Sequence, residues 1–205
     1  MTRTSLFVRF VLLFLAILPS SPADAVTRDE ALLGKAITTP KLDTPFFHTT
    51  ETSYHWWIVE DDNGHVEDTT DGVIDANDLL RVEHTASCVS SHQGKHQMNF
   101  CDAMTTPNGV TLVFTGGLPA YASSLTVMID RTLHYRCLFS ATYPALTNPL
   151  QWKILKQELR LKSPDLRRGA RIYGWLSVTF AEIDTITHET RTYKIEGYFK
   201  PVLQH

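Results

Sequence analysis

Apolar and polar residues alternate along much of the chain beyond residue 100. Val110, Leu112 and Phe114, for example, are separated by single residues that would face the opposite way. Successive side chains of a β-strand point to opposite faces, so a period of two predicts strands with one buried face. The same alternation recurs in segments 125–129, 133–139, 158–162, 171–180 and 192–199.

Turn-forming residues separate these segments at short intervals. They include Asn63-Gly64, Pro107-Asn108-Gly109 and Asp130-Arg131. Short alternating strands between such turns are typical of antiparallel sandwiches and barrels. We therefore predict a mostly β fold, an antiparallel β-sandwich or partly open barrel with little helix. Residues 148–162 fit a helix or two strands, and we favour a strand at Glu158–Lys162. The aromatic, β-branched segment Thr52–Glu60 predicts a further strand.

The first 25 residues have the pattern of a secretory signal peptide. Arg3 and Arg9 flank the start of the apolar run Phe10–Leu18, and Ala23-Asp24-Ala25 forms a small-residue cleavage site. Nine apolar residues are too few to span a bilayer, which takes about 20. We predict cleavage after Ala25 and a single secreted or periplasmic β-rich domain over residues 26–205, with no membrane span after signal removal.

Two cysteines, Cys88 and Cys101, lie at symmetric distances from Gly94-Lys95. If those two residues form the turn of a hairpin, the cysteines face each other across its strands, close enough for a disulfide. An oxidising compartment favours that bond, and we predict it. The same register sends His92 and His96 to opposite faces, which argues against a shared metal ion.

The third cysteine, Cys137, shares strand parity with Leu133, Tyr135 and Phe139. This parity predicts a buried, unreactive thiol. A reactive or intermolecular cysteine is the alternative.

The acidic segment Glu67–Asp78 (EDTTDGVIDAND) has the spacing of a calcium loop. With Gly72 at the sixth position, oxygen ligands fall at regular positions and an apolar residue follows at the eighth. The run DGVIDANDLL resembles the calcium loops of dockerin modules, which also end in Asp; the resemblance covers this loop and a few residues beyond it. It departs at the entry, where a short Asp is expected. The alternative is a solvated acidic turn. The expected calcium ligands are Glu67, Thr69, Asp71, Val73, Asp75 and Asp78.

Aromatic residues gather on one side of the last two predicted strands. Tyr173, Trp175 and Tyr198 lie opposite in parity to the apolar residues of those strands. If exposed together, they would form a ligand surface suited to a sugar ring or a protein partner; if covered, they belong to a core. Nearby lysines and arginines between residues 153 and 171 are best explained as protection of an exposed strand edge.

Charge is unevenly distributed between the two parts of the chain. Residues 26–103 carry 14 acidic and 5 basic side chains, and residues 104–205 carry 7 acidic and 12 basic ones. Such asymmetry can mark a binding surface. Packing of the two parts against each other is the simpler explanation within one domain.

Sequence motifs for enzyme chemistry are missing. There is no Gly-rich phosphate loop, His-Glu-x-x-His helix, Cys-x-x-Cys pair or Gly-x-Ser-x-Gly elbow. We therefore expect a non-enzymatic binding or structural module that recognises a glycan or an envelope protein, stabilised by calcium, with nucleic acid an unexpected partner. The alternative is an extracytoplasmic hydrolase that acts on polysaccharide through paired carboxylates.

Overall fold

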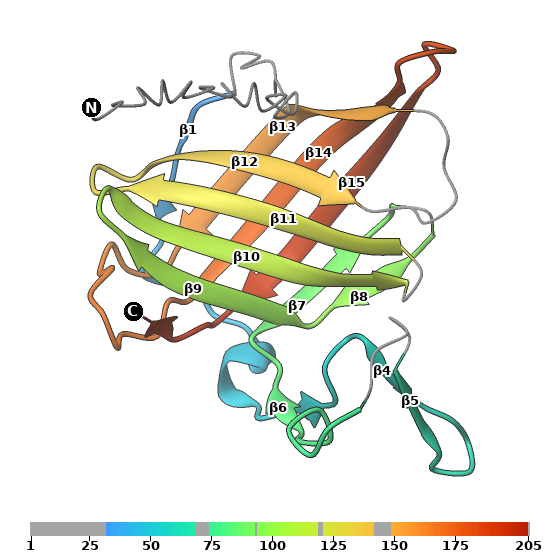
Figure 1. Ribbon diagram of the computed structural model, residues 1–205. Coiled ribbons are helices and arrows are strands. Elements are labelled where there is room, and N and C mark those ends of the chain that lie inside the picture. Colours follow the sequence, from blue (N-terminus) through green and yellow to red (C-terminus); the bar gives the residue numbers. More distant parts are fainter. Residues whose placement is uncertain (1–31, 69–73, 93, 119–120, 142–148, 205) are drawn as a thin grey trace, which may run out of the picture. The chain divides into compact units, whose positions relative to one another are not determined.

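The computed structural model describes residues 32–68, 74–92, 94–118, 121–141 and 149–204. Two six-stranded sheets make up most of it (Figure 1). The predicted β-sandwich is confirmed. In spatial order the first sheet contains β1 (Gly34–Lys35), β12 (His134–Ala141), β11 (Tyr121–Asp130), β10 (Gly109–Leu118), β9 (Phe100–Thr106) and β16 (Leu203–Gln204).

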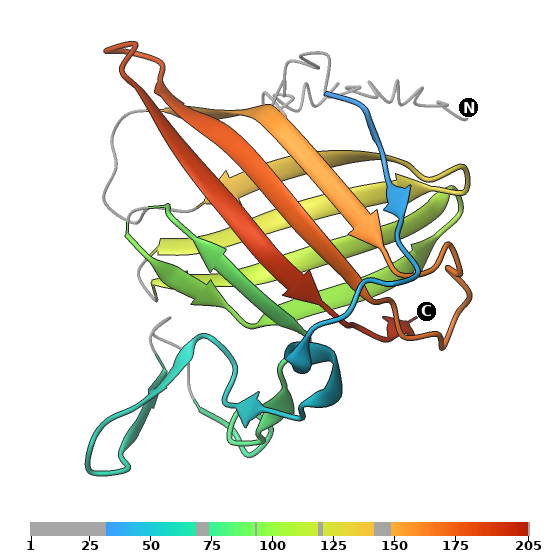
Figure 2. The ribbon, with the colours of Figure 1, turned by 180° about the vertical axis from the view of Figure 1, so that it is seen from behind.

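The second sheet lies behind the first in Figure 1 and in front of it in Figure 2. Its long strands are antiparallel neighbours, and β2 joins the edge of β13 in parallel. In spatial order it contains β2 (Ile37–Thr38), β13 (Leu150–Leu161), β14 (Gly174–Asp184), β15 (Thr190–Phe199), β7 (Ala86–Ser90) and β8 (His96–Met98).

The core lies between the inner faces of the two sheets. Leu112 and Phe114 of the first sheet and Val178 and Phe180 of the second are all fully buried. Burying one such side chain contributes about 1.5–3 kcal/mol, so the alternating pattern supplies the main stabilisation of the sandwich. Because the period of two sends every second residue inward, these burial positions follow the alternation predicted from the sequence.

Local turn chemistry sets the register of the first sheet. Pro107 and Asn108 connect β9 to β10, and Thr106 pairs with Gly109. Gly109 has a φ of +154°, and a Cβ there would lie 2.0 Å from the backbone oxygen of Ile129. Only glycine fits this position, so the close approach of β10 to β11 next to this turn depends on Gly109.

Most of the ambiguous segment 148–162 forms a strand, from Leu150 to Leu161. This strand, β13, has a bulge between Ile154 and Lys156, so the helical interpretation is wrong. On the side of β13 away from β14, hydrogen bonds of the Gln157 side chain take the place of backbone pairing with another strand. Its Oε1 accepts a hydrogen bond from the Cys137 backbone N–H at 3.0 Å, and its Nε2 donates to the Leu32 carbonyl at 2.6 Å.

Residues 43–68 and 74–83 form smaller elements beside the sandwich. These are the 3₁₀ helix η1 (Pro45–His48), the pair β3 (Thr52–Ser53) and β6 (Val82–Glu83), and the hairpin β4 (Ile58–Glu60) and β5 (Val66–Asp68). The Asn63-Gly64 turn joins β4 to β5 as predicted. The predicted strand over residues 52–60 is interrupted between Ser53 and Ile58.

The predicted Cys88–Cys101 disulfide is absent, because both thiols are free and buried. Residues 91–95 connect β7 to β8, and Cys88 pairs with Met98 rather than Cys101. After Asn99 the chain enters the other sheet, where Cys101 opposes Phe114. The predicted hairpin centred on Gly94-Lys95 is therefore wrong. Ser90 pairs with His96 instead, and the chain passes into the other sheet before it reaches Cys101.

Among the described residues, no helix has the length and apolar character needed to cross a membrane. The predicted signal peptide, residues 1–25, lies outside the described residues.

Candidate functional site

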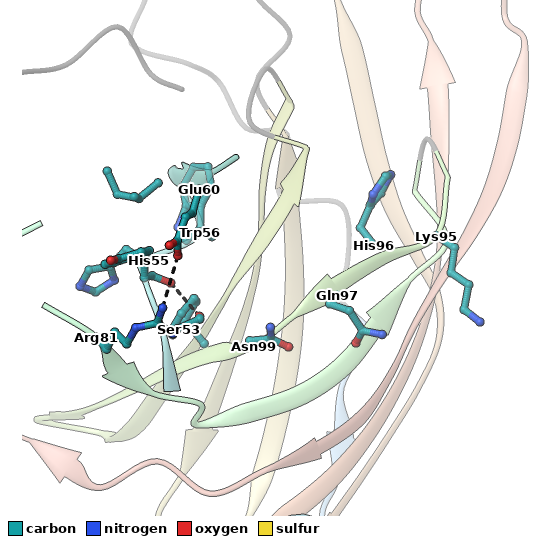
Figure 3. A pocket seen from close by; sticks show the side chains of 12 residues that line it. Ser53, His55, Trp56, Glu60, Arg81, Lys95, His96, Gln97 and Asn99 are labelled. Carbon is teal, nitrogen blue, oxygen red and sulfur yellow. Dashed lines mark hydrogen bonds and ion pairs between the residues drawn. The ribbon is translucent and has the colours of Figure 1, made fainter. Parts of the chain in front are cut away.

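A cleft of about 470 Å³ lies between the interrupted 53–60 segment, Arg81 and the strands β8 and β9 (Figure 3). Its volume falls in the range of ordinary small-ligand sites, roughly 300–1,000 Å³. Aromatic rings, amides and charged groups all contribute to its wall. The lining residues are Ser53, Tyr54, His55, Trp56, Ile58, Glu60, Arg81, Lys95, His96, Gln97, Asn99 and Phe100.

Ring stacking shapes one wall of the cleft. The His55 imidazole stacks on the Trp57 indole at 4.3 Å with an interplanar angle of 5°, and it lies 5.6 Å from the Phe100 ring. The Trp56 and Trp57 rings meet edge to face at 5.7 Å. These rings restrain one another, so Trp56 and His55 present a defined apolar surface to a ligand.

The charged groups of the cleft form two sets, the Arg81–Glu60 ion pair and the more distant Lys95. Arg81 Nη2 donates to Glu60 Oε2 at 3.3 Å, and its guanidinium lies 4.9 Å from the centre of the Tyr54 ring. The Arg81 and Glu60 side chains are 53% and 40% exposed, so this ion pair contributes about 1 kcal/mol or less. Figure 3 shows Lys95 and His96 well away from Arg81, with Asn99 and Gln97 between them.

A buried hydrogen bond between a histidine and a glutamate holds the segment that carries Lys95 and His96. His92 Nε2 lies 3.0 Å from Glu182 Oε2, and the two side chains are only 3% and 5% exposed. The rings of Phe139, Phe180 and Tyr193 surround the imidazole at 4.8–5.9 Å. His92 thus fastens the β7–β8 connection to the core, while His96 lines the cleft.

Backbone contacts fasten the same connection from its other side. The Ser91 N–H donates to the Lys194 carbonyl at 2.9 Å, and the Lys194 N–H donates to Ser91 Oγ at 2.8 Å. The connection is therefore bound to β15 as well as to β14, and the position of this cleft wall depends on the second sheet.

The predicted aromatic surface does share one face of the second sheet. Trp175 pairs with Tyr198 across β14 and β15. The Phe47 ring of η1 packs on it, 5.0 Å from Tyr173 and 5.8 Å from Tyr198, and Phe47 is itself buried. Arg160 lies 5.1 Å over the Trp175 ring. Much of this face is therefore occupied by the protein's own side chains, which the sequence did not reveal because η1 is distant along the chain.

Only part of the predicted calcium loop lies within the described residues. Thr69, Asp71 and Val73 fall outside them, whereas Glu67, Asp75 and Asp78 are described. Asp75 Oδ1 accepts from the Asn77 and Asp78 N–H groups at 2.6 and 3.1 Å, and Asp78 Oδ2 accepts from the Asp75 N–H at 2.8 Å. Within the described part of the chain, no three His, Cys, Asp or Glu residues gather as metal ligands. The calcium site stays a prediction.

All three thiols lie in the core. The predicted burial of Cys137 is confirmed, and burial raises its pKa to about 12. Burial also raises the pKa of Cys88 to about 12 and holds that of Cys101 well above its usual value. Since the thiolate is the nucleophile, we expect these cysteines to be unreactive in the folded protein.

The interpretation of Thr52–Glu60 as one strand does not predict the cleft, because the structure interrupts that segment between Ser53 and Ile58. Neighbouring residues of a strand face opposite sides, so the run Tyr54-His55-Trp56-Trp57 would have needed two covered faces. Four consecutive aromatic residues therefore indicate a turn in which the rings cluster, rather than a strand.

Protein-family models, curated proteins and solved structures were all compared with this chain, and none of them matches it.

Proposed function

We propose that this chain is a secreted or periplasmic binding module that holds a ligand in the cleft between residues 53–60, Arg81 and β8. The observation that carries the proposal is the composition of the cleft wall. Rings that can cover an apolar ligand face stand beside amides that can donate and accept hydrogen bonds. A saccharide has both properties, since its ring carbons are apolar and its hydroxyls are polar.

The hydrolase alternative requires two carboxylates that converge on one substrate bond. Among the described lining residues Glu60 is the one acid, and its carboxylate faces Arg81. The buried carboxylate of Glu182 belongs to the pair with His92 inside the sandwich. The arrangement therefore favours binding over hydrolysis at this cleft.

Isothermal titration of the purified protein with a panel of soluble oligosaccharides tests the proposal. We expect binding that Trp56→Ala weakens about tenfold or more, because the ring that covers the ligand is lost. Trp175→Phe on the outer face of β14 is the matched control and should leave the affinity unchanged. Cleavage of an oligosaccharide, or loss of affinity in the control alone, would contradict the proposal.

A further inference from the structure

The cleft carries more positive than negative fixed charge. Arg81 and Lys95 line it against the single carboxylate Glu60. Because Arg81 already faces Glu60, the Lys95 ammonium is the unbalanced charge. Among the described residues no carboxylate forms an ion pair with Lys95.

This positive charge stands out against its surroundings. Residues 26–103 carry 14 acidic and only 5 basic side chains, yet two of those five line the same cleft. Binding of an anion in this cleft would therefore depend on Arg81 and Lys95. The Lys95 charge supports recognition of a negatively charged group at its end of the cleft.

The geometry places the polar and apolar contacts in order along the wall. Figure 3 shows Trp56 and His55 on the side of Arg81, Asn99 and Gln97 beyond them, and Lys95 and His96 at the far end, where their side chains point in different directions. A ligand that spans this wall would meet rings first, amides next and a cation last. We propose that the cleft takes an acidic saccharide, with a sugar ring on Trp56 and the carboxylate of a uronic acid residue at Lys95.

This inference rests on the proposed function and specifies the ligand class. The amides of Gln97 and Asn99 would bond the ring hydroxyls, since each amide offers both donors and an acceptor. The Lys95 ammonium would make a charge-assisted hydrogen bond to the carboxylate, which is about twice as strong as a neutral one. The uronate charge, rather than the sugar backbone, would then set the affinity.

The test compares charged and neutral members of one saccharide series. Trigalacturonate and triglucuronate are titrated beside their methyl esters, which keep the backbone and lose the charge. We expect the acids to bind about tenfold more tightly than the esters at low salt, with the difference shrinking as salt screens the charges. Lys95→Gln should remove the difference, and Lys41→Gln, an exposed lysine away from the cleft, should preserve it.

Each outcome decides a different claim. Equal binding of acids and esters, weakened by Trp56→Ala, would leave the cleft a binding site and overturn the acidic specificity. Absence of binding by every saccharide of both series would overturn the inference, and the broader panel would then decide the proposed function by itself. A preference for acids that survives Lys95→Gln would place the anion elsewhere and also refute the inference.

Discussion

The buried pair His92–Glu182 allows a sharp test of how the second sheet is stabilised. The two side chains are 3% and 5% exposed and their closest atoms are 3.0 Å apart. His92→Phe keeps an aromatic ring among Phe139, Phe180 and Tyr193 but removes the nitrogen that contacts the carboxylate. Breaking a buried pair by removing one partner typically costs about 3–5 kcal/mol, and we expect a loss of this order here because the Glu182 carboxylate loses its contact with His92 while staying buried.

The expected loss is large enough to measure by thermal or urea unfolding. For a protein of this size each kcal/mol shifts Tm by about 2–4 °C, so His92→Phe should lower Tm by about 6–20 °C. The double variant His92→Phe with Glu182→Leu should recover at least half of that loss, because both polar groups are then replaced by apolar ones.

An exposed ion pair on the adjacent strand provides the control. Lys194 Nζ lies 2.5 Å from Glu196 Oε2, but the two side chains are 50% and 44% exposed. Glu196→Gln should therefore cost about 1 kcal/mol or less. If His92→Phe costs no more than this control, or if the double variant is less stable than the sum of both single changes, the pair does not stabilise the core as described.

Three further predictions concern groups outside that pair. Arg171 donates a hydrogen bond to Glu83 at 2.8 Å and lowers the pKa of this carboxyl below its ordinary 4.5. About 1 kcal/mol of folding stability should therefore be present above pH 4.5 and lost as the pH falls through the lowered pKa. Urea titrations at several pH values should show this acid sensitivity, and Glu83→Gln should remove it. The three cysteines should react with an alkylating reagent only after unfolding, so rapid native labelling by mass spectrometry would contradict their raised pKa values. Calcium at ~100 times its dissociation constant should stabilise the protein by about 2.7 kcal/mol relative to chelator, an effect that Asp75→Ala abolishes; equal melting temperatures would leave a plain acidic turn.

The long strands were predictable because one physical rule governs them. In β10, β11 and β14 every second residue faces the core, so alternation in the sequence corresponds directly to burial. The Pro107-Asn108-Gly109 turn was predictable for a similar reason, since glycine is required locally. These features depend on neighbours within a few residues.

The candidate site depends on contacts that local patterns do not encode. The cleft joins Trp56, Arg81 and Lys95, and the cover on Tyr173 comes from Phe47, more than one hundred residues earlier. The incorrect disulfide has the same origin. Symmetry about Gly94-Lys95 was a local argument, whereas the passage of the chain from β8 into the other sheet is a property of the whole fold.

The central claim, that the cleft is the ligand site, is tested most directly by NMR titration of the labelled protein with trigalacturonate. The account predicts shifts of the Trp56 indole and of the backbone amides of Arg81 and residues 95–99, with the oligosaccharide recovered intact. Shifts confined to Tyr173, Trp175 and Tyr198, or release of shorter saccharides during the titration, would contradict it.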